Sequence, residues 1–153
     1  MDSLLASLLD PPFAKDPPVK LNIPAKTLGL VYAILGGISA VLGFFGVIAL
    51  FGLSAITAVA GVGSVFILIL IGGVIGEIGT IFTALGGYKM YQGDQGGKKT
   101  AIYGLAINVV GGLVSSIGSY GAGIPGWIFG TAITFVLYYL VIICRFEDAP
   151  KPA

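Results

Sequence analysis

The stretch GGVIGEIGTIFTALGG, residues Gly72–Gly87, decides the fold of this chain. On a helix that advances about 100° per residue, its side chains divide into two faces. The bulky apolar residues lie on one face. The small residues lie on the other, with Glu77 at its edge: Gly72, Gly73, Gly76, Gly79, Thr80, Thr83, Ala84, Gly86 and Gly87. Such a helix presents large side chains to an apolar surrounding and lets a second backbone approach its small face.

The composition of the whole chain is that of an integral membrane protein. Of its 153 residues, 56% are hydrophobic and 10% are charged, whereas about a quarter of the residues of soluble domains are charged. Its mean hydropathy is +1.01. The 25 glycines show no three-residue period, and glycine within apolar runs is typical of transmembrane helices. We therefore expect an all-α domain in contact with the lipid bilayer.

Composition also argues against several classes of function. The net charge is +1 and no basic run is interleaved with aromatic residues, so nucleic acid is not an expected partner. The chain has no histidine and one cysteine, which excludes an internal disulfide, a histidine-ligated metal or haem, and histidine-based acid–base chemistry. Because no nucleophile is paired with a base and no cofactor motif is present, we expect neither an enzyme nor a bound cofactor or metal.

Apolar runs long enough to cross a membrane occur four times. A helix needs about 20 apolar residues to span the hydrocarbon core, and we place the spans at residues 27–51, 63–91, 99–120 and 126–145. Residues 52–62 carry no charge and join the first two spans. The prediction is an antiparallel bundle of four transmembrane helices over residues 27–145.

The positions of the basic residues support this count. Every one lies before the first span, at or between the facing ends of the second and third spans, or at or after the end of the fourth: Lys15, Lys20, Lys26, Lys89, Lys98, Lys99, Arg145 and Lys151. The remaining loops carry no charge. The positive-inside rule then places the charged side in the cytoplasm, and with it both termini of a protein of the cell's inner membrane.

The segments outside the spans are short. Residues 1–10 have leucines at helical spacing and an aspartate where a signal peptide would carry positive charge, which predicts an amphipathic helix at the membrane surface. Residues 11–26 contain prolines that prevent a continuous helix, and they are expected to form an extended strap. Residues 146–153 form a cytoplasmic tail.

Glycines recur every seven residues in the first three spans. The three series are Gly29, Gly36 and Gly43; Gly72, Gly79 and Gly86; and Gly104, Gly111 and Gly118. Each series lies on one helix face, because seven residues make two turns, and close packing on small residues is what holds helices together in lipid. The spacing suits left-handed crossings of about +20°. The fourth span is bulky after Thr134, so we expect it to be peripheral to the other three.

Two polar residues lie within the predicted spans at similar depths. At 1.5 Å per residue, Glu77 is about 18 Å from Lys89, and Asn108 is about 13 Å from Lys99. Because these depths nearly match in an antiparallel hairpin, we predict that Glu77 and Asn108 form an intramembrane polar pair. A mid-membrane carboxyl group is a functional-site hypothesis, although polar contacts between transmembrane helices contribute only about 1 kcal/mol or less.

Two functions fit this pattern. The first is a non-catalytic structural or accessory subunit of a homo-oligomer or larger membrane complex, which packs through its glycine-rich helix faces. The alternative is a small proton or ion channel, or a transporter, in which Glu77 is the titrating site. In the fourth span, Thr131, Thr134, Tyr138 and Tyr139 are candidates to line a lipid or pigment groove, ordinary packing being the other interpretation.

Overall fold

The computed structural model describes residues 7–14, 17–19, 21–59 and 63–146 of the chain, with the backbone alone described at 54–59 and 63–65. Its described elements are a short 3-10 turn and four long helices: η1 (Pro12–Ala14), α2 (Ala25–Val59), α3 (Gly63–Tyr91), α4 (Gly96–Gly118) and α5 (Ile124–Ile143). Each of the four helices is long and apolar enough to cross a membrane. The fold class predicted from the sequence, an all-α membrane protein with four transmembrane helices, is confirmed.

The helix ends differ from the predicted spans at several places. α2 continues to Val59, eight residues past the predicted end of the first span at 51, because neither a proline nor a charge interrupts residues 52–59. α3 has the predicted bounds. α4 begins at Gly96 and ends at Gly118, where Tyr120 and Gly121 adopt positive φ angles and turn the chain toward α5. Pro125 lies in the first turn of α5, where its missing N–H costs nothing.

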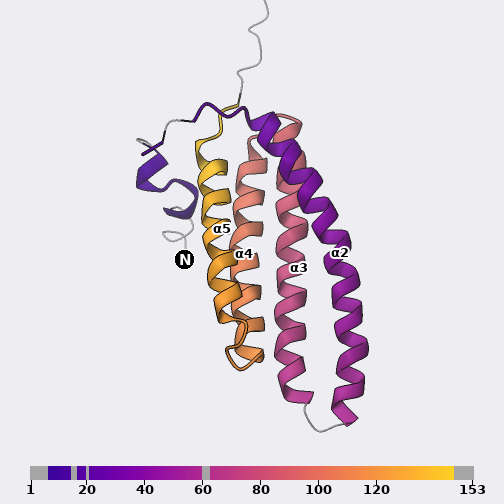
Figure 1. The fold of residues 1–153 in the computed structure, drawn as a ribbon. Helices are drawn as coiled ribbons and strands as arrows, with labels where there is room; N and C mark the ends of the chain where they lie inside the picture. Colours follow the sequence, from indigo (N-terminus) through magenta and orange to yellow (C-terminus); the bar gives the residue numbers. More distant parts are fainter. Residues whose placement is uncertain (1–6, 15–16, 20, 60–62, 147–153) are drawn as a thin grey trace, which may run out of the picture.

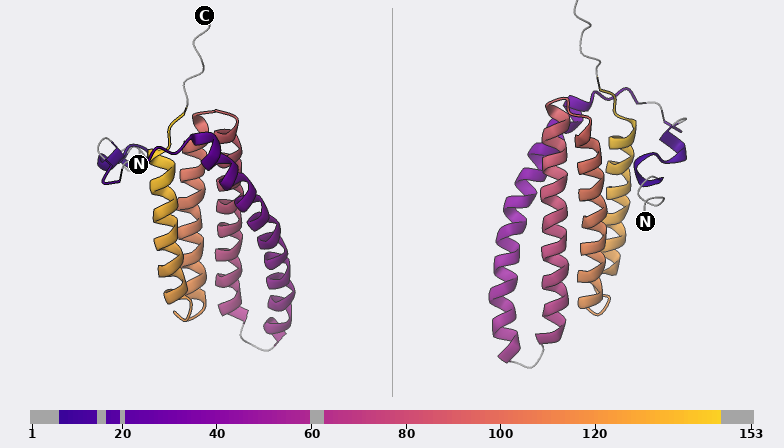
Figure 2. Two further views of the ribbon diagram at one scale, coloured as in Figure 1. Left: turned by 45° about the horizontal axis from the view of Figure 1, so that its top comes forward. Right: turned by 180° about the vertical axis from the view of Figure 1, so that it is seen from behind.

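The four helices lie side by side in the order α2, α3, α4, α5 (Figure 1). α3 packs against both α2 and α4, and α5 packs against α4. The start of α2 meets the end of α5, since the Ala25 N–H donates to the Arg145 carbonyl at 2.7 Å and the Arg145 N–H donates to the Ile23 carbonyl at 3.0 Å. From this junction α2 leans away from α5, as both views in Figure 2 show.

We call the end of the bundle that carries the α2–α5 junction the charged end. Its described basic residues are Lys26, Lys89, Lys98, Lys99 and Arg145. The α4–α5 turn at the opposite end, residues 119–123, contains no charge. The described part of the chain thus has the one-sided distribution of charge that the four-span count requires.

Lys98 ties α4 to the end of α5. Its Nζ donates to the carbonyl of Cys144 at 2.6 Å and to that of Ile142 at 3.2 Å, and it lies 5.6 Å from the centre of the Phe146 ring. These carbonyls have no partner within the helix, so a cation here satisfies them and opposes the negative end of the helix dipole. Burial raises the pKa of the Cys144 thiol, an effect that the charge of Lys98 partly opposes.

The segment before α2 lies against α5. The predicted amphipathic helix falls mostly outside the described residues, but residues 7–9 are helical, and the Tyr138 hydroxyl donates to the Leu8 carbonyl at 2.6 Å. The Phe13 ring contacts the rings of Tyr138 and Tyr139. The Tyr139 hydroxyl also donates to the carbonyl of Val19 and accepts from its N–H. In its described parts the proline-rich segment therefore straps the outer side of α5.

Candidate functional site

One side of α3's small face forms the contact with α4. A Cβ added to Gly79 would lie 2.7 Å from the backbone nitrogen of Asn108 and from the carbonyl oxygen of Gly104. A Cβ added to Gly111 would lie 2.5 Å from the backbone nitrogen of Gly76. Gly72, Gly86, Gly104 and Gly118 make equivalent close approaches to the opposite helix. These distances leave no room for a methyl group, so glycine sets the spacing of α3 and α4.

The other side of the small face forms the contact with α2. A Cβ added to Gly29 would lie 2.6 Å from the Gly87 carbonyl oxygen, and one added to Gly36 would lie 3.0 Å from the Ala84 Cβ. A Cβ on Gly43 would overlap the Glu77 carboxyl group. All nine glycines of the three seven-residue series thus lie in the α2–α3 or α3–α4 interface, with α3 at the centre.

The glycines of α5 itself do not make its contact with α4. Nothing lies within 4 Å of a Cβ added to Gly126 or Gly130. The contact is made instead by Trp127, whose Nε1 donates to the Val109 carbonyl at 3.0 Å and whose ring lies 2.9 Å from a Cβ added to Gly112. α5 is therefore held by a bulky side chain and by the strap, as expected for the peripheral helix.

The structure does not bring Glu77 and Asn108 together. The Glu77 carboxyl group lies against Gly43 of α2, and within the described residues it has no hydrogen-bond partner. It is partly exposed. Because Glu77 and Thr80 are three residues apart, they are turned about 60° from each other around α3. Glu77 belongs to the α2 side of α3, and Asn108 contacts the other side.

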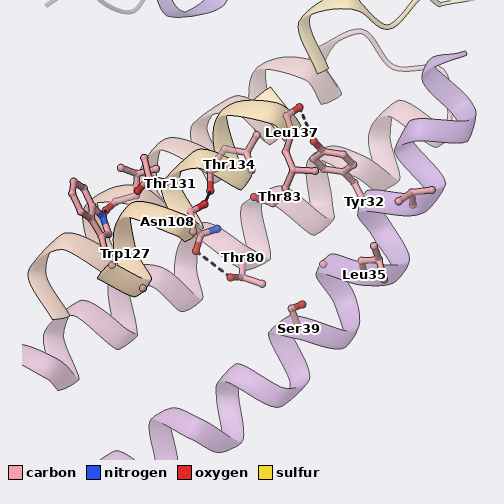
Figure 3. Close-up of a pocket in the computed structure, with 17 residues that line it drawn as sticks. Tyr32, Leu35, Ser39, Thr80, Thr83, Asn108, Trp127, Thr131, Thr134 and Leu137 are labelled. Carbon is pink, nitrogen blue, oxygen red and sulfur yellow. Dashed lines mark hydrogen bonds between the residues drawn. The ribbon is translucent and has the colours of Figure 1, made fainter. Parts of the chain in front are cut away.

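Asn108 joins α4 to α3. Its amide lies 3.2 Å from the Thr80 hydroxyl (Figure 3). With its amide nitrogen turned toward α3, it donates to that hydroxyl and, at 2.8 Å, to the Gly76 carbonyl oxygen. The same carbonyl accepts the Thr80 hydroxyl at 3.1 Å in the helix. Asn108 therefore makes a polar contact between α4 and α3, and α3 alone supplies the acceptors for its amide N–H groups.

Comparison of the chain with protein-family models, curated proteins and solved structures finds no match. The function must be inferred from the arrangement of its own residues. Among the described residues, no group of three or more His, Cys, Asp or Glu side chains is placed so that it could hold a metal ion. Two features remain as candidate functional sites. They are the Glu77 carboxyl group and a separate groove between α2 and α5.

The groove lies between α2 and α5 and has a volume of about 450 Å³. α3 and α4 form its floor, and Figure 3 shows the side chains that line it. α2 contributes Val31, Tyr32, Leu35, Gly36 and Ser39; α3 contributes Thr80 and Thr83; α4 contributes Leu105, Asn108, Val109 and Gly112; and α5 contributes Gly126, Trp127, Gly130, Thr131, Thr134 and Leu137. No charged residue is among them.

Hydrogen bonding at the groove is uneven. The Tyr32 hydroxyl donates to the Leu137 carbonyl at 2.8 Å and links α2 to α5 at the part nearest the charged end (Figure 3). The Thr134 hydroxyl donates to the Gly130 carbonyl within α5. The Thr131 Oγ1, by contrast, is buried and has no partner. Within the described residues it is a buried polar atom that the fold leaves unsatisfied, which is rare and calls for a ligand or water.

The groove was only partly visible in the sequence. Thr131 and Thr134 line it, as one interpretation of the fourth span predicted. Tyr138 lines a smaller apolar cavity of about 220 Å³ beside the N-terminal segment, and Tyr139 lines neither cavity and binds Val19. The missed signal was the spacing of Gly126, Gly130 and Thr134, which leaves small residues along part of the α5 wall.

Proposed function

We propose that this membrane protein is a non-catalytic subunit of a homo-oligomer or of a larger membrane complex. The observation that carries the proposal is the Glu77 carboxyl group. It lies about 18 Å from the charged end at 1.5 Å per residue, is partly exposed, and has no hydrogen-bond partner among the described residues. A polar group in this position is costly in hydrocarbon, and a donor from a neighbouring subunit removes that cost.

The surface around Glu77 supports such a contact. α2 packs on α3 through one face only, and its outer side chains are exposed, with Leu42 at 66% and Phe45 at 63%. Glu77 emerges beside Gly43, where α2 offers no side chain to cover it. A neighbouring helix can therefore reach the carboxyl group and pack on α2 at the same time.

Replacing Glu77 tests this contact. Glu77→Ala is expected to release smaller particles than the wild type on mild-detergent extraction, whereas Glu77→Gln, which still forms hydrogen bonds, retains the assembly. Ile78→Ala is the matched control, because Ile78 is the next residue on the same helix and is 45% exposed. An unchanged particle mass for Glu77→Ala would overturn the role of this residue.

A proton or ion pathway through Glu77 is the second candidate function. A mid-membrane carboxyl group favours it in principle, but Glu77 lines neither of the two cavities described above. Flux in liposomes separates the two functions. Conduction requires pH-dependent flux that Glu77→Gln abolishes, and a subunit role predicts no flux in either protein.

We further propose that the charged end faces the cytoplasm of a cell whose inner membrane holds the protein, because positive residues are retained on that side. Single cysteines placed at Lys99 and Ala122, in a Cys144→Ser background, report on the two ends. A membrane-impermeant maleimide added to intact cells is expected to label the cysteine at 122 and not the one at 99. The reverse pattern contradicts this orientation.

A further inference from the structure

We propose that the groove between α2 and α5 binds the head of a neutral lipid whose ring carries carbonyl oxygens, a quinone being the type. This site is separate from Glu77 and independent of the subunit role. Three properties of the groove lead to this ligand: its depth, its hydrogen-bonding groups and its size.

The depth of the groove excludes a charged head group. Ser39 and Thr131 are each thirteen residues from the charged end, counted from Lys26 and Cys144, which is about 20 Å at 1.5 Å per residue. The hydrocarbon core is about 30 Å thick, so both side chains lie well inside it. A phospholipid head stays at the interface, and a ligand that reaches this depth enters sideways from the bilayer between α2 and α5.

The hydrogen-bonding groups favour a carbonyl-bearing ligand. The Thr131 Oγ1 is buried without a partner. On the opposite wall, the Ser39 hydroxyl also has no hydrogen bond among the described residues. Two hydroxyl groups can each donate to a carbonyl oxygen. A saturated acyl chain in the same place leaves both hydroxyls unpaired, and an ionised ligand finds no countercharge in the lining.

The size of the groove fits a single ring with its substituents. A volume of about 450 Å³ is within the range of small-molecule sites. It corresponds to about fifteen water molecules at roughly 30 Å³ each, and so to a head of about fifteen non-hydrogen atoms. Gly126 and Gly130 add no side chain to the α5 wall, which leaves open space beside Trp127, Thr131 and Thr134. The open side between the helices gives an apolar tail a way into the bilayer.

Trp127 provides the test, because it is the only tryptophan of the chain and it lines the groove. Decylubiquinone is added to the purified full chain in lipid nanodiscs, and Trp127 fluorescence is measured. We expect saturable quenching in the wild type. Gly130→Leu is expected to abolish the saturable part, since nothing lies within 4 Å of a Cβ at Gly130 and the new side chain can occupy the groove.

Two further variants make the test specific. Gly37→Leu is the matched control, because Gly37 is equally open and does not line the groove. It is expected to keep the wild-type saturation curve. Thr131→Val removes one hydrogen bond and is expected to raise the apparent Kd about fivefold. Circular dichroism and particle size establish that each variant is folded.

Two results would overturn the proposal. The first is quenching that rises linearly with quinone and is the same in the wild type and Gly130→Leu, which indicates partitioning into the bilayer only. The second is quenching of Trp127 by phosphatidylcholine brominated in mid-chain that Gly130→Leu relieves and decylubiquinone does not compete. That result assigns the groove to an acyl chain.

Discussion

Gly79→Ala is the substitution that most sharply tests how the helices are held together. The added Cβ meets two backbone atoms of α4, the nitrogen of Asn108 and the carbonyl oxygen of Gly104, both at 2.7 Å. Neither atom can turn aside as a side chain can, so α3 and α4 must separate by roughly 1 Å to restore ordinary contact distances of about 3.5–4.0 Å. Overpacking of this kind costs about 1–3 kcal/mol.

The same separation weakens the polar contact of Asn108 with α3. Hydrogen bonds between transmembrane helices contribute about 0.6 kcal/mol on average. Alanine also favours a helix by up to about 1 kcal/mol over glycine, which offsets part of the loss. We therefore expect Gly79→Ala to lower the free energy of unfolding by about 1–2 kcal/mol.

Gly126→Ala is the matched control for this prediction. Nothing lies within 4 Å of a Cβ at Gly126, so the same substitution is expected to leave stability unchanged or to raise it slightly. Equilibrium unfolding in mixed micelles with increasing dodecyl sulfate measures both variants against the wild type. Equal stability of Gly79→Ala and Gly126→Ala would refute the argument that glycine sets the spacing of α3 and α4.

Two further predictions concern the charged end. Lys98→Gln removes the cation that binds the Cys144 and Ile142 carbonyls and is expected to lower the free energy of unfolding by about 1 kcal/mol; Lys99→Gln, at an exposed neighbour, is the control, and equal effects of the two changes would contradict the role of Lys98. Because burial raises the pKa of the Cys144 thiol, the thiol is expected to react with a maleimide far more slowly than a free cysteine at pH 7. Removing Lys98 takes away a positive charge that lowers this pKa, so in Lys98→Gln the pH at which the reaction accelerates is expected to rise, and a fall would count against the account.

The sequence predicted the architecture well because its strongest signals are one-dimensional. Helix length and one-sided charge determine the number of spans, and a seven-residue glycine spacing needs no knowledge of the neighbouring helix. The spacing therefore identified interface residues from the sequence alone, and all nine glycines lie in contacts between helices. The end of α2 was missed because its residues beyond Phe51 contain nothing that stops a helix.

The prediction that Glu77 pairs with Asn108 rested on their matching depths alone. Depth gives the position of a residue along its helix and says nothing of the direction it faces. The small face of α3 is wide enough to hold two neighbours, so Glu77 faces α2 while Asn108 contacts Thr80. The groove was hidden for a related reason, since it results from the lean of α2 away from α5, which hydropathy does not encode.

The mass of the native particle tests the central claim most directly. Membranes are dissolved into copolymer nanodiscs without detergent, and the particle that contains the chain is weighed by native mass spectrometry. The account predicts a defined particle that holds more than one copy of the 15.6 kDa chain or this chain with other subunits. A particle with one copy of the chain and lipid alone would contradict it.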